Sequence, residues 1–223
     1  AYDAIPHLVA VTGLNLILYQ LDRAREVLDR PSITMVCEIV SPKKSVVRDL
    51  SGDSYQHNNM LPQQALDRFI RMVTETPSWE AALASDEPAL NAAELLKKAF
   101  DWPEPDDSDD VGTDPNQLVA RLIDKAVTRH KQHVGKAHAT WARAIGLSSR
   151  RSSRRVRYAP TDRLLKTLVV TCVARRIEFK DFLEVLYRRY GIVIGDGQAR
   201  DLIEREYRQI SGGGCPTPLA FGR

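Results

Sequence analysis

Apolar residues recur at intervals of three and four along most of the chain, the spacing of amphipathic helices. This pattern covers residues 8–29, and it returns over 61–100, where Pro77 and Pro88 divide the region into three helices. A third stretch, 115–145, keeps one continuous apolar face and predicts a single long helix. We therefore expect a mainly α-helical fold.

The exception to the helical spacing is a short segment near residue 35. Residues 33–40 are rich in β-branched side chains and end at Ser41-Pro42, as a strand would. Val46 and Val47 are candidates for a second short strand after a polar turn. We expect a small β hairpin here, which helices must cover to make it stable.

Charge divides the chain more sharply than hydropathy does. The net charge is only +3, yet residues 101–114 carry seven acidic residues and no basic one. That segment contains three turn-forming residues and little apolar surface, so it predicts a linker. The expected organisation is a helical domain with the β element, an acidic linker, a basic domain and a tail, at residues 1–100, 101–114, 115–210 and 211–223.

The basic half of this asymmetry predicts a polyanion partner. Lys125 to Pro160 holds ten Lys and Arg and no acidic residue, and such stretches attract nucleic acid. An Arg/Ser loop at 148–157 is its densest part, and arginine suits phosphate because its guanidinium donates two hydrogen bonds. The predicted phosphate contacts are Arg150, Arg151, Arg154, Arg155 and Arg157, extended along the preceding helix by Lys131, Lys136 and Arg143.

Two other interpretations of this basic stretch stay open. The Arg/Ser loop could dock on an acidic protein, because carboxylates satisfy arginine as phosphates do. Alternatively, the acidic 101–114 segment folds back on the loop and acts as a weak autoinhibitor that competes with phosphate. Such an exposed contact is screened by salt and adds little stability.

The C-terminal part predicts three short helices, over 160–176, over 179–190 and from Asp196 onward. Glycines lie between the last two, as in a helix-turn-helix. The final helix would present Gln198, Arg200 and Arg208, side chains suited to base edges and phosphates. The segment resembles the helix-turn-helix half of winged-helix modules, which implies DNA binding, although no pair of strands follows Tyr207. A plain three-helix packing unit is the alternative.

Other chemistry finds little support in the residue pattern. There is no phosphate-binding glycine loop of the Gly-Lys-Ser/Thr type. His130, His133 and His138 have no cysteine or carboxylate close in sequence that would complete a metal site. Glu38 and Asp49 could belong to a hydrolase only if they converged around a metal. We expect no catalytic residue, metal or cofactor.

These observations favour a non-enzymatic subunit that binds nucleic acid, DNA more than RNA, with residues 1–100 contacting a partner protein. A place in bacterial DNA processing or genome defence fits this architecture. The alternative is a helical scaffold whose basic loop docks on an acidic protein. Three scattered cysteines and the lack of a membrane-length apolar run favour a soluble cytoplasmic protein.

Overall fold

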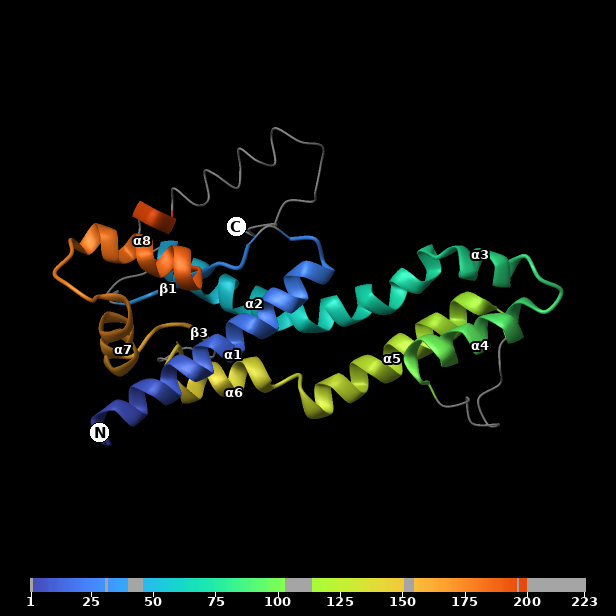
Figure 1. The fold of residues 1–223 in the computed structure, drawn as a ribbon, viewed down its shortest axis with the longest axis horizontal. Coiled ribbons are helices and arrows are strands. Elements are labelled where there is room, and N and C mark those ends of the chain that lie inside the picture. The colour runs from blue at the N-terminus through green and yellow to red at the C-terminus, as the bar shows by residue number, and fades with distance from the viewer. Residues whose placement is uncertain are drawn as a thin grey trace. The chain divides into compact units, whose positions relative to one another are not determined.

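A computed structural model describes residues 2–30, 32–39, 46–102, 114–150, 155–195 and 197–199. The fold is mainly helical with small β elements, as the apolar spacing predicts (Figure 1). The chain divides into two compact units built from separated segments: unit 1 holds residues 1–14, 34–57 and 142–223, and unit 2 holds 15–33 and 58–141. Helices α1 (Ile5–Val27), α2 (Val46–Arg71) and α6 (Ala137–Ala144) each contribute residues to both units.

The β element of unit 1 is not the predicted hairpin. Strand β1 (Met35–Cys37) pairs in parallel with β4 (Ile192–Ile194), a partner from the far end of the described chain. Strands β2 (Ser148–Ser149) and β3 (Arg157–Tyr158) form an antiparallel pair. The Glu38 N–H donates to the Tyr158 carbonyl at 3.0 Å, which joins the two pairs.

Helix α2 explains why the hairpin prediction is wrong. It begins at Val46, where the sequence predicts the second strand, and it continues through Pro62. Its buried side includes Ser51 and Asn58, at 0% and 3% exposure. Because these buried positions are polar, the sequence shows too little apolar contrast for the helical period to stand out.

The C-terminal helices occur where the pattern places them. Helix α7 covers Asp162–Cys172, within the predicted 160–176, and α8 covers Phe179–Tyr190, as predicted. Gly191 ends α8 in the left-handed conformation that favours glycine, with φ at 65°. Strand β4 then occupies what a helix-turn-helix would use as its tight turn, and residues 197–199 are helical. The rest of the predicted third helix lies outside the described residues.

Unit 2 has its own apolar core, which the end of α2 shares with three further helices: α3 (Pro77–Leu83), α4 (Pro88–Phe100) and α5 (Pro115–His133). The 3-10 turn η2 (Met72–Glu75) leads from α2 into α3, and Trp79 lies in the core at 2% exposure. Residues from every one of these elements meet in it: Ile70, Val73, Trp79, Ala92, Leu96, Leu118, Val119, Leu122 and Ile123. Figure 1 shows α3 and α4 in green and α5 in yellow-green.

The helix predicted over 115–145 is interrupted. Helix α5 ends at His133 and α6 begins at Ala137, because the Gly135 N–H donates to the His130 carbonyl, which already accepts the regular helical bond from Val134. The bond from Gly135 spans five residues rather than four, which breaks the regular ladder. A single apolar face continues through such a break, so periodicity alone does not reveal it.

The predicted linker stays a prediction, because residues 103–113 lie outside the described part of the chain. Its first two residues close α4, where Asp101 adopts a left-handed conformation with φ at 49°. Its last residue, Asp114, caps α5 by accepting from the Asn116 N–H at 2.9 Å.

Candidate nucleic-acid interface

The Arg/Ser loop starts and ends on a fixed base in unit 1. Strands β2 and β3 pair Ser148 with Tyr158 and Ser149 with Arg157, so the loop connects two antiparallel strands. Leu147 and Tyr158 are fully buried beneath it, and the Ala159 N–H donates to the Leu147 carbonyl at 2.9 Å. The two ends of the predicted loop therefore pair with each other in a short antiparallel ladder. Arg151 and Arg154, which we predicted as phosphate contacts, lie outside the described residues.

Arg157 differs from the prediction. Its side chain is 6% exposed, and it donates to the Glu38 carboxylate at 3.0 Å, whose own side chain is 11% exposed. A buried guanidinium with a paired carboxylate is not available to phosphate, and removing either partner leaves a buried charge. Side chains of a strand point alternately to its two sides, and at the β3 position of Arg157 the side chain points into unit 1. We leave Arg157 out of the proposed contacts.

Arg155 is at the surface beside α2. Its guanidinium is ion-paired with Asp53 and donates to the Gln56 Oε1 at 3.4 Å. The side chain lies across Gly52, where an added Cβ would come within 2.9 Å of the Arg155 Nε. Glycine at this position therefore lets the arginine lie flat on α2, with 41% of its side chain exposed.

Arg150 is exposed at the other end of the loop. It lies near the phenol of Tyr55: burial raises the pKa of Tyr55, and the charge of Arg150 opposes that rise. Tyr55 in turn meets Tyr158 edge to face, with ring centroids 5.3 Å apart. An aromatic pair thus supports the side of the loop from which Arg150 extends.

The three cations predicted on the preceding helix do not all lie on one helix or in one unit. Lys131 lies on α5 and Lys136 in the break after it, both exposed and both in unit 2. Arg143 is exposed on α6 but belongs to unit 1, together with Arg150 and Arg155. The structure therefore places Arg157 on the ladder, Arg150 and Arg155 in the segments that flank it, and the other three described cations on α5, on α6 and in the break between these helices.

A shallow hollow of about 350 Å³ lies against α5. One acid and three basic or imidazole side chains line it with two polar ones: Asp124, Lys125, Arg129, His133, Thr128 and Gln132. These positions recur at four-residue intervals, so they share one face of the helix. Lys125 and Arg129 therefore place exposed positive charge on this face of α5.

The groups predicted to approach the DNA groove are mostly outside the described residues. Arg200 and Arg208 are among these. Gln198 is described, and its Oε1 accepts from the Ile194 N–H at 3.4 Å. The side chain thereby closes the turn after β4, so in this structure it serves the fold.

The histidines show no common site. His133 is exposed on α5, whereas His138 is 2% exposed on α6, where burial lowers its pKa to about 4. Burial also raises the pKa of the Cys37 thiol, which disfavours its reactive thiolate. Within the described ranges, no group of three or more His, Cys, Asp or Glu residues is placed to hold a metal ion.

The structure also presents cations that the sequence analysis did not select. Exposed basic side chains occur on α7, α8 and the turn between them, all in unit 1: Arg163, Lys166, Arg175, Arg176, Lys180, Arg188 and Arg189. The four on α7 and the turn are spread over an acid-free stretch, 163–177, among apolar residues, and the three on α8 share that helix with Asp181 and Glu184, so no dense basic run marked them. Only their position outside the apolar faces of both helices could have identified them.

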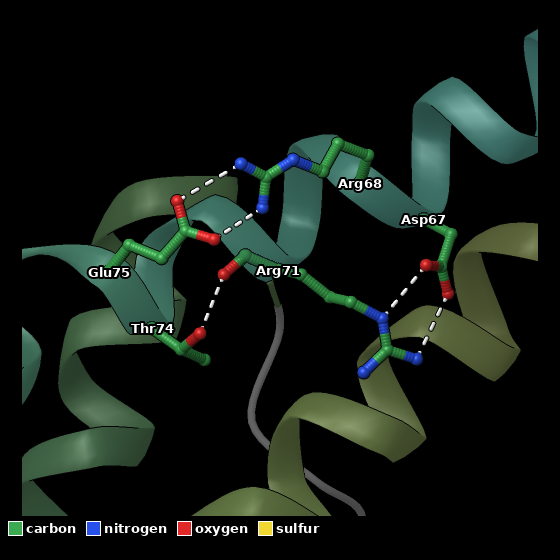
Figure 2. Close-up of polar contacts among 5 residues, drawn as sticks. All are labelled: Asp67, Arg68, Arg71, Thr74 and Glu75. Carbon is green, nitrogen blue, oxygen red and sulfur yellow. Dashed lines mark hydrogen bonds and ion pairs between the residues drawn. The ribbon is translucent and has the colours of Figure 1, made fainter. Parts of the chain in front are cut away.

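Other exposed arginines are already matched by carboxylates. Figure 2 shows Arg68 paired with Glu75 and Arg71 paired with Asp67 through two hydrogen bonds, of 2.8 and 3.2 Å, in unit 2. The hydrogen bond from Arg68 holds the pKa of Glu75 below its ordinary value. These two ion pairs lie near the end of α2, and in each of them a carboxylate neutralises the arginine.

Comparisons with protein-family models, with curated proteins and with solved structures found no match to this chain. No helix within the described residues has the length and apolar character needed to cross a membrane.

Proposed function

We propose that the protein is a non-enzymatic subunit that binds nucleic acid, DNA rather than RNA, through the Arg/Ser loop of unit 1. The observation that carries this proposal is the placement of Arg150 and Arg155 at the two ends of a loop whose base is a buried ladder. Because the paired strands β2 and β3 hold the two ends of the loop, less conformational entropy is lost when its arginines bind a phosphate backbone. The acid-free sequence from Lys125 to Pro160 supplies no local competitor.

Arg155 adds a specific feature to this proposal. Its guanidinium is held by Asp53, so phosphate binding there exchanges one anion for another. The exchange is favoured at a polyanion because releasing condensed counterions contributes to affinity. The exposed cations of α7 and α8 belong to the same unit as the loop.

The test is the salt dependence of binding to a duplex and to a single strand, with matched variants. Arg150→Ala/Arg155→Ala removes two proposed phosphate contacts. Arg68→Ala/Arg71→Ala is the control: it removes the same charge from exposed arginines of unit 2 that, like Arg155, are ion-paired with carboxylates but lie outside the loop. We expect the loop variant to weaken binding about tenfold near 0.1 M salt and to reduce the slope of log K against log salt by about 2, and we expect the control to change neither by much.

Three results would contradict the proposal. Absence of binding to either DNA form at about 50 mM salt, where the electrostatic term is strong, would end it. Equal affinity for polyglutamate of matched charge would instead favour docking on an acidic protein. Equal losses in the two variants would show that net charge alone, and not the loop, determines binding.

A further inference from the structure

Helix α1 is apolar on two opposite sides. One side is buried, with Leu14, Ile17 and Leu21 at 0% exposure. The other side carries large apolar residues that remain exposed: Ile5 53%, Leu8 66%, Val9 58%, Leu16 47% and Tyr19 67%. At about 100° per residue, these five lie within about 60° of Thr12 around the helix. We call these six residues the outer stripe.

The outer stripe has the properties of a covered surface. No Asp, Glu, Lys or Arg occurs from Ala4 to Leu21. A helix that is apolar around its circumference is normally buried, and a contiguous exposed apolar patch marks an interaction site. Positions 5, 9, 12, 16 and 19 alternate steps of four and three, which is the spacing of a coiled-coil seam.

Most of the stripe is also symmetric about Thr12; the exception is Val9, whose counterpart three residues after Thr12 is the polar Asn15. Ile5 and Tyr19 each lie seven residues from Thr12, and Leu8 and Leu16 each lie four residues from it. A second α1 in antiparallel orientation would place Ile5 against Tyr19, Leu8 against Leu16, and Thr12 against itself. Interfaces between identical chains related by a two-fold axis require this self-complementarity. The small central side chain allows the two helices to approach closely where they cross.

We propose that the outer stripe binds the outer stripe of a second copy of this chain, with the two α1 helices antiparallel and the two-fold axis at Thr12. The arrangement aligns opposite ends of the helix dipoles, which favours the antiparallel pair. Each of the five exposed side chains presents on the order of 100 Å², so the pair would bury about 1,000 Å², near the lower limit for a specific interface. The dimer is therefore concentration-dependent.

The first test is sedimentation velocity on the full chain at about 5 and about 200 μM, a range that brackets weak association. We expect the wild-type chain to shift from monomer toward dimer. Val9→Glu inserts a charge into the stripe and should weaken association at least tenfold. Val170→Glu makes the same change at an exposed valine of α7, with 67% exposure, and should leave association unchanged.

Circular dichroism and thermal unfolding of both variants check that each remains folded. The inference is separate from the proposed function, so Val9→Glu should retain the salt slope of the wild-type chain for DNA. Loss of DNA binding in Arg150→Ala/Arg155→Ala should leave dimer formation intact.

Cysteine cross-linking tests the orientation, in a chain where Cys172 and Cys215 are replaced by Ser. Thr12→Cys should form a disulfide-linked dimer on mild oxidation. Ile5→Cys or Tyr19→Cys alone should not, whereas a mixture of these two variants should. A parallel pair would instead cross-link each variant with itself, and that result would overturn the antiparallel arrangement.

Three further results would overturn the proposal. The first is a wild-type chain that stays monomeric at 200 μM. The second is a monomer that binds phosphatidylcholine vesicles through the stripe, which would identify lipid and not a second copy as the partner. The third is equal loss of dimer in Val9→Glu and Val170→Glu.

Discussion

At the scale of single residues, His138 gives the clearest pH dependence. Burial disfavours its charged imidazolium and lowers its pKa from 6.5 to about 4. Between these values the unfolded chain binds more protons than the folded one, so stability is complete above pH 6.5 and falls as pH drops toward 4. For a shift of this size the loss is on the order of 3 kcal/mol.

Urea unfolding at pH 7.5, 6 and 5 measures this loss, with His138→Gln as the variant and His133→Gln as its exposed control. We expect His138→Gln to flatten the decline in the free energy of unfolding below pH 6.5. His133→Gln should follow the wild-type curve. An unchanged slope in His138→Gln would assign the pH dependence to other groups; burial also lowers the pKa of His130, which is present in every variant.

The arginines of the loop show what the sequence could and could not predict at this scale. Their abundance and the absence of acids are visible in the printed residues. Their separate environments are not, because Arg157 meets Glu38 and Arg155 meets Asp53, partners about a hundred residues away in the chain. Residue type therefore predicted the charge of the surface, while tertiary pairing determined which charges reach it.

At the scale of elements, local patterns predicted helices well and strand partners poorly. Helix α8 has strong apolar spacing and an ending glycine, and its predicted bounds agree with the structure. Strand β1 was recognised, but its partner β4 comes from the other end of the described chain. A parallel pair of three-residue strands leaves no turn signal between its partners, so the sequence suggested a nearby hairpin instead.

Next to strand β1, Glu38 contacts β3 through its buried ion pair with Arg157. Arg157→Met leaves the Glu38 carboxylate buried without its ion-pair partner and should reduce the free energy of unfolding by about 3 kcal/mol. Glu38→Leu/Arg157→Met removes both charges and should regain most of that loss, because apolar replacements of buried pairs are often well tolerated. Urea denaturation of the two variants measures the difference.

Arg155→Met is the matched control, since it removes the same charge from a neighbouring but exposed pair. It should cost less than about 1 kcal/mol, as exposed ion pairs contribute little. If Arg155→Met and Arg157→Met destabilise equally, burial does not distinguish the two arginines. A double variant no more stable than Arg157→Met would show that the residue shape, and not the unpaired charge, causes the loss.

At the scale of the whole molecule, the fold class could be predicted from the sequence, but the grouping of distant segments into units could not. Composition and periodicity predicted the mainly helical class. In unit 2, α5 shares one core with α2 to α4, a contact across the acidic segment that apolar spacing does not predict. The units themselves are interleaved: residues 34–57 join residues from beyond 142 in unit 1. Long-range pairing such as β1 with β4 produces that interleaving, and no local pattern reports it.

The acidic segment provides the last prediction, which concerns charge over the whole chain. Neutralising Asp106, Asp107, Asp109 and Asp110 to Asn removes four negative charges from the segment that, in one of the interpretations given above, competes with phosphate for the loop. The control removes four exposed acids elsewhere, by Glu80→Gln, Asp86→Asn, Glu87→Gln and Glu94→Gln. Both variants have the same net charge, so a difference between them isolates the position of the acids.

We expect the acidic-segment variant to bind DNA several-fold more tightly than the control at about 50 mM salt. The advantage should shrink near 200 mM, because the screening length shortens as salt rises. Gel-shift titrations at both concentrations measure it. Equal affinities of the two variants at low salt would mean that the segment acts only through net charge; a position-specific gain would show that the acidic and basic segments, adjacent in the sequence, compete for the same arginines.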